Sequence, residues 1–203
     1  MDTEKAAEEL RVIRQLMERP VRCSTMSGLS GILAGCAALA GVLADWHVSR
    51  TYSPYRAVKI NMAVWAGVFA VAFVAAIVLT RLREVKRGMP SWSRVKRRIL
   101  VTILPPFVAG VGLTAAIAYR WWIGQGPNMW GLIPAVWMLF YGLALWQVGL
   151  FSPVEVRLLG VLFLLAGLAT AALFHSHPYW SLGVTFGGFH IVYGVVVWIR
   201  HGG

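Results

Sequence analysis

Six apolar stretches of about 20 residues set the main constraint on what this chain can fold into. A helix of about 20 apolar residues crosses a bilayer core about 30 Å thick. The chain has 203 residues, of which 58% are hydrophobic and 13% are charged, so it is too apolar for a soluble domain of its size. The sequence therefore predicts an all-α, polytopic membrane helix bundle with six transmembrane helices, at about residues 24–44, 60–80, 99–118, 130–150, 156–174 and 180–199.

The segment before the first apolar stretch has a different pattern. Four apolar residues recur there at spacings of four, three and four, as in an apolar stripe along a helix: Ala6, Leu10, Ile13 and Met17. Pro20 ends the pattern. We therefore divide the chain into a cytoplasmic amphipathic helix, residues 1–22, and a six-helix transmembrane domain, residues 23–203. The amphipathic helix is expected to lie on the membrane or on the bundle, and the alternative is that residues 3–19 dock a cytoplasmic or membrane protein partner.

Basic residues are distributed unevenly between the two sides of the predicted bundle. Of the 19 Lys and Arg, all but Arg50, Arg56, Lys59 and Arg120 fall on the side of the two termini. The positive-inside rule then places both termini of this multi-pass membrane protein in the cytoplasm. The eight bases of residues 81–98 are interpreted as a stop-transfer loop that contacts lipid headgroups. The expected partner is thus the lipid bilayer, and no direct binding of nucleic acid is expected.

Small residues mark one face of the first transmembrane helix. Ser27, Gly31 and Gly35 are four residues apart, which lets the backbone of another helix approach closely. We expect this contact to be intramolecular, and homo-oligomerisation stays open.

His190 lies in the stretch GFHIVYG, residues 188–194, at the predicted mid-membrane depth. It belongs to a run with spacings of four, three and four that is turned toward a neighbouring helix: Gly183, Gly187, His190 and Gly194. Tyr141 has a similar depth, whereas Glu155 is roughly 15 Å away at 1.5 Å per residue. We therefore predict a hydrogen bond between Tyr141 and a neutral His190.

Two other roles for His190 stay open, a proton or ligand role and, third, haem ligation. Haem would usually need a second axial ligand, and no second histidine is predicted at this depth. No cofactor is expected. Pro105, Pro106 and Pro134 are expected to break their helices, which would suit a cavity beside His190 in a transporter.

Weaker candidate sites lie at the predicted helix ends. Imidazole and carboxylate groups suit Zn²⁺ or Cu²⁺, and four such residues are predicted on the outer side: Asp45, His47, His175 and His177. At the cytoplasmic side, Glu155 fits the beginning of a helix, where a carboxylate interacts favourably with the helix dipole. Its alternative role is pairing with the basic stretch 81–98. Glu18, Arg19, Glu155 and Arg157 are the candidate residues for a cytoplasmic contact.

Three separated segments resemble a family of small bacterial six-helix membrane proteins. They are IRQLMERPVRCSTMSGLSGILAG at 13–35, LFYGLALWQVGLFSPVEVRLLG at 139–160 and GVTFGGFHIVYG at 183–194. The resemblance singles out Met17, Glu18, Arg19, Ser27, Gly28, Ser30, Gly31, Gly35, Tyr141, Gly142, Glu155, Arg157, Gly160, Gly187, His190, Tyr193 and Gly194. The chain departs from it at Pro20, where the family has Ser. Because similar proteins are often encoded beside winged-helix regulators, the resemblance implies a signalling or stress-response context.

The sequence favours a non-enzymatic regulatory or partner-binding module. No serine, histidine and aspartate set, paired acids, phosphate loop or zinc-protease motif can be assembled at one depth. The alternative is a small transporter or ligand-binding membrane protein with a cavity near His190 and Tyr141, and an enzyme comes third.

Overall fold

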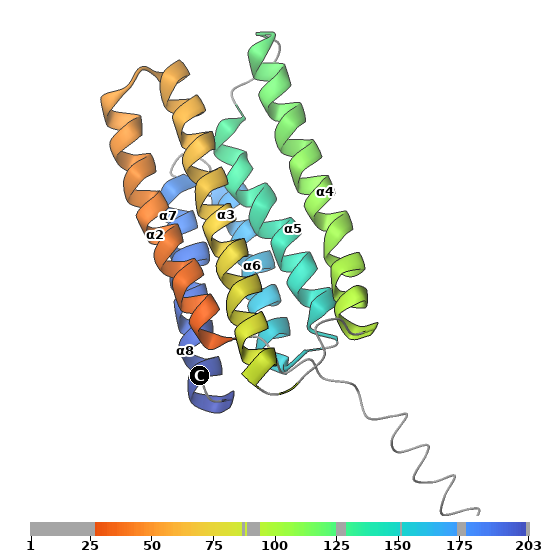
Figure 1. Cartoon of the computed structure of the whole chain (residues 1–203). Coiled ribbons are helices and arrows are strands. Elements are labelled where there is room, and N and C mark those ends of the chain that lie inside the picture. The colour runs from red at the N-terminus through yellow and green to blue at the C-terminus, as the bar shows by residue number, and fades with distance from the viewer. Residues whose placement is uncertain are drawn as a thin grey trace, which may run out of the picture.

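A computed structural model describes residues 27–86, 88, 94–124, 129–150, 152–173 and 178–201. Six helices in these ranges are long and apolar enough to cross a membrane, and they lie side by side in one bundle (Figure 1). The predicted all-α helix bundle is confirmed, and the described ranges contain no strand. The expected amphipathic helix with Glu18 and Arg19 lies outside the described residues, as do His175 and His177.

The elements follow one another with short connections. In chain order they are α2 (Gly28–Thr51), α3 (Pro54–Lys86), α4 (Arg94–Trp122), a 3₁₀ turn (Trp130–Leu132), α5 (Ile133–Val148), α6 (Val154–Leu173), α7 (Pro178–Leu182), a π-helical segment (Gly183–Phe189) and α8 (His190–His201).

The helices differ in how far they are enclosed by the bundle. α2 packs on α3 and α8, and α5 packs on α6 and α4. In the most apolar 18-residue stretch of α3 no residue is buried, and in that of α4 11% of the residues are buried. The corresponding share is at least 33% in each of the other four membrane spans. α3 and α4 are therefore the peripheral helices. The hydrophobic core centres on α5 and α6, where Met138 and Phe163 are fully buried.

Glycines bring α2 into backbone contact with α8 and with the π-helical segment before it. A Cβ atom added to Gly28 would lie 2.5 Å from the carbonyl oxygen of Gly194, and one added to Gly35 would lie 2.7 Å from that of Gly187. No side chain can shift to relieve such contacts, because the opposing atoms belong to the backbone. The predicted small-residue face of the first helix is thus used within the chain, against the glycine-rich last helix.

The same device joins α5 to α6. A Cβ atom on Gly142 would lie 2.9 Å from the carbonyl oxygen of Gly160, and one on Gly160 would lie 2.7 Å from the backbone nitrogen of Trp146. Tyr141, beside Gly142, is thereby fixed close to α6.

Two sequence expectations need correction. The stretch 81–98 was expected to be a loop, yet α3 continues through Lys86 and α4 begins at Arg94. Between the two helices the structure describes Gly88, whose φ of 63° suits glycine. Pro134 does not break its helix but lies in the first turn of α5, where a missing amide donor costs nothing. Pro105 and Pro106 do lie inside a helix, α4.

Candidate functional site

Tyr141 and His190 meet in the interior of the bundle. The Tyr141 hydroxyl and the Nε2 atom of His190 are 2.7 Å apart, a hydrogen bond that links α5 to the first residue of α8. The His190 side chain is buried. The contact predicted from the depth of the two residues is therefore present, between positions 49 residues apart in the chain.

Two phenylalanines enclose the pair. The Phe163 ring packs edge-on against Tyr141 at 4.9 Å and against His190 at 5.3 Å between ring centroids. Phe186 stacks on the imidazole with an interplanar angle of 13° and also contacts Tyr141. The polar pair thus lies in an apolar environment, where its two groups are each other's natural hydrogen-bond partners.

A π-helical segment lies immediately before His190 in the last membrane span. It covers Gly183–Phe189, and a π segment shifts the faces that a regular α-helical spacing would predict. The His190 carbonyl oxygen faces α2, 3.1 Å from where a Cβ of Gly31 would lie, while the imidazole reaches α5. The imidazole thus meets Tyr141 of α5, whereas Gly187 and Gly194 pack on α2. The density of glycines in residues 183–188 was the only sequence signal of this segment.

The second ring nitrogen of His190 is less well satisfied than the first. Nδ1 is buried and has no hydrogen-bond partner among the described residues, although the carbonyls of Thr185 and Phe186 lie nearby. The Thr185 hydroxyl donates to the Ser181 carbonyl instead, at 2.7 Å. If Tyr141 donates to Nε2, the proton of the imidazole resides on Nδ1.

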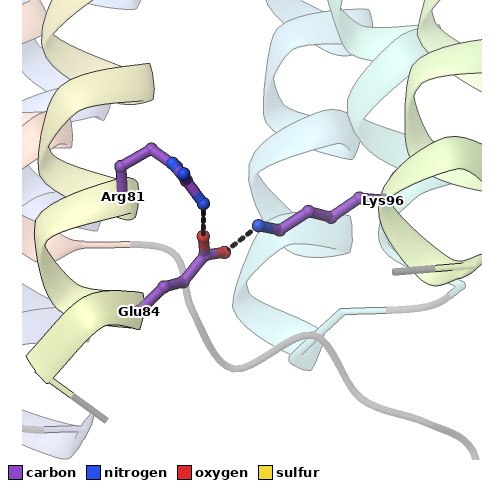
Figure 2. Close-up of polar contacts among 3 residues, drawn as sticks. All are labelled: Arg81, Glu84 and Lys96. Atoms are coloured by element: carbon purple, nitrogen blue, oxygen red, sulfur yellow. Dashed lines mark ion pairs between the residues drawn. The ribbon is translucent and has the colours of Figure 1, made fainter. Parts of the chain in front are cut away.

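A second polar cluster, which the sequence reading missed, lies between the peripheral helices. Glu84 of α3 forms ion pairs with Lys96 of α4 and, at 3.8 Å, with Arg81 one turn earlier in α3 (Figure 2). The Glu84 side chain is 1% exposed, against 47% for Arg81. Glu84 stands among eight bases in the sequence, and nothing in the local pattern distinguishes it from a solvated charge.

This cluster belongs to one end of the bundle, which we call the basic end. There α3 and α8 end and α4 and α6 begin, at the bottom of Figure 1. The basic residues there whose side chains are described are Arg81, Arg83, Lys86, Lys96, Arg97, Arg98, Arg157 and Arg200, beside two acids, Glu84 and Glu155.

Glu155 lies in the first turn of α6, as expected of a carboxylate at a helix N-terminus. It accepts a hydrogen bond of 3.0 Å from Arg200 of α8, in an ion pair. The Arg157 guanidinium lies 5.6 Å from the ring centroid of Trp146. Both candidate contact residues therefore also hold helices together at the basic end.

The candidate metal ligands do not come together in the described part of the chain. Asp45 accepts a hydrogen bond from the Trp65 side chain, and His47 is exposed. No group of three or more His, Cys, Asp or Glu residues forms a metal site within the described ranges. The two remaining candidates, His175 and His177, lie outside those ranges.

Searches against protein families, curated proteins and solved structures find no match to this chain. The family resemblance of the three sequence segments therefore stays a prediction.

Proposed function

We propose that this chain is a non-enzymatic regulatory module of the bacterial inner membrane that binds a partner protein. The observation that supports this most is the arrangement of the intramembrane polar groups. Tyr141 and His190 are bonded to each other and enclosed by Phe163 and Phe186. Such a pair stabilises the association of helices in the membrane, which suits a rigid scaffold better than a pathway for solutes.

The proposed orientation follows from the distribution of charge. The basic end carries eight Lys and Arg residues whose side chains are described, whereas the opposite end carries Arg50, Arg56, Lys59 and Arg120. The positive-inside rule places the basic end in the cytoplasm, with both termini on that side. Residues 3–19 are the proposed docking segment. The resemblance to proteins encoded beside winged-helix regulators supports a signalling or stress-response role for the module.

The partner is tested with the apolar stripe of the N-terminal segment. A full-length chain carrying Leu10→Ser and Ile13→Ser is expected to lose its co-purifying partner in cross-linked native membranes. A matched control carries Glu8→Ser and Gln15→Ser, which fall on the opposite face of the predicted helix by sequence spacing, and should retain the partner. Deletion of residues 1–19 that changed neither the captured proteins nor the expression of neighbouring genes would rule this function out.

A small transporter or ligand-binding protein is the second candidate. One observation favours it: α4 contains the Pro105–Pro106 pair in its interior. In this case His190→Ala should abolish binding or movement of a solute in proteoliposomes, while Tyr119→Phe on the surface of α4 should not. A His190→Ala variant that binds and moves every tested solute like the parent would eliminate this candidate.

A further inference from the structure

The two peripheral helices meet through side chains at three levels, although their backbones do not pack closely within the described ranges. Tyr55 stacks on Trp121 at 5.4 Å between centroids, at the end away from the basic end. Phe69 contacts Phe107 at 5.6 Å, about halfway along. The third bridge joins Glu84 to Lys96 at the basic end. Two helices held together in this way leave apolar side chains between the bridges without a helix packed on them.

The stretch between the second and third bridges is lined by four apolar side chains, and we call it the α3–α4 seam. By helical spacing, Phe73 and Ile77 share the face of Glu84, Leu100 lies one turn from Lys96, and Leu104 lies one turn beyond Leu100. Each of these side chains is about half exposed: Phe73, Ile77, Leu100 and Leu104.

The three charged residues at the basic end of the seam carry a net positive charge. Glu84 supplies one negative charge against Arg81 and Lys96 (Figure 2). The Arg81 contact of 3.8 Å is too long for a hydrogen bond. A guanidinium has five N–H donors that match the geometry of a phosphate. Arg81 therefore keeps hydrogen-bonding capacity toward an anion at the level of the headgroups.

An occupant of the seam must combine an apolar chain with a negative charge. A phospholipid has this combination, and basic sites between transmembrane helices are known to recognise anionic headgroups. We propose that the α3–α4 seam binds one anionic phospholipid, with its phosphate on Arg81 and Lys96 and one acyl chain along the seam. Glu84 acts as a positioning residue that holds the Lys96 ammonium beside Arg81. This inference does not depend on the proposed function.

The test is native mass spectrometry of the full-length protein with added phosphatidylglycerol or phosphatidylcholine. The protein should retain one phosphatidylglycerol at least tenfold more strongly than phosphatidylcholine. Arg81→Gln should abolish this preference. The matched control, Arg97→Gln, removes the same charge from an exposed residue at the same end, and should weaken retention by about fivefold or less. Ile77→Trp fills the seam without changing any charge and should reduce retention of both lipids.

Several outcomes would overturn the proposal. Equal losses in Arg81→Gln and Arg97→Gln would show general attraction to anionic lipid. Displacement of the lipid by millimolar inorganic phosphate would show that the site binds an anion and does not bind the acyl chain. A dimer that dissociates in Arg81→Gln or Ile77→Trp would identify a second copy as the occupant, and lipid retention that appears only after deletion of residues 1–19 would identify that segment. Thermal unfolding of each variant reports whether it is folded.

Discussion

The hydrogen bond between Tyr141 and His190 should be worth a measurable part of the stability of this bundle. Tyr141→Phe removes only the hydroxyl that lies 2.7 Å from Nε2 and leaves the aromatic contacts with Phe163 and Phe186 in place. Interhelical hydrogen bonds in membranes contribute about 0.6–1.7 kcal/mol. A buried imidazole nitrogen left without a partner adds to the cost, so we expect Tyr141→Phe to lower the free energy of unfolding by about 1–2 kcal/mol.

The measurement is an unfolding titration with sodium dodecyl sulfate in mixed micelles, followed by tryptophan fluorescence. His190→Leu and the double variant complete a cycle with a coupling energy of about 1 kcal/mol, because replacing both partners by apolar groups leaves no orphaned polar atom. Tyr119→Phe makes the same change on a side chain that is 64% exposed, and should shift stability by less than about 0.5 kcal/mol. A Tyr141→Phe variant as stable as Tyr119→Phe, with no coupling to His190→Leu, would refute the reasoning.

The same titration checks three further predictions. Gly194→Ala should lower the free energy of unfolding by about 1–3 kcal/mol, because the added Cβ would lie 2.5 and 2.7 Å from backbone atoms of α2. Gly67→Ala, with open space around it, should be neutral or stabilising. Equal effects of the two substitutions would contradict the backbone contact. Lys96→Met should lower the free energy of unfolding by about 3 kcal/mol, because the buried Glu84 carboxylate loses the Lys96 ammonium. Adding Glu84→Gln to this variant should restore part of the lost stability. Arg200→Gln removes an ion pair whose cation is 64% exposed, so a loss above about 1 kcal/mol would be unexpected.

The candidate site was predictable to the extent that it depends on depth in the membrane. Tyr141 and His190 are about equally far from the ends of their apolar stretches, and helical rise converts that count into a common level. That the glycines beside His190 would pack on α2 was not predictable, because this contact depends on how the helices are arranged around the last one. The burial of Glu84 was not predictable either, because it depends on the position of α4 beside α3.

The sequence by itself determined the number of membrane-crossing helices and the small-residue faces of the first and the last of them. Both properties are local: apolar length is matched to bilayer thickness, and the helical repeat assigns residues to a face. Only the tertiary structure decided which face meets which. It placed α2 against α8 through Gly28 and Gly194, and it left α3 and α4 at the periphery with Glu84 between them. Such pairing depends on how all six helices fill space together, which no stretch of sequence contains.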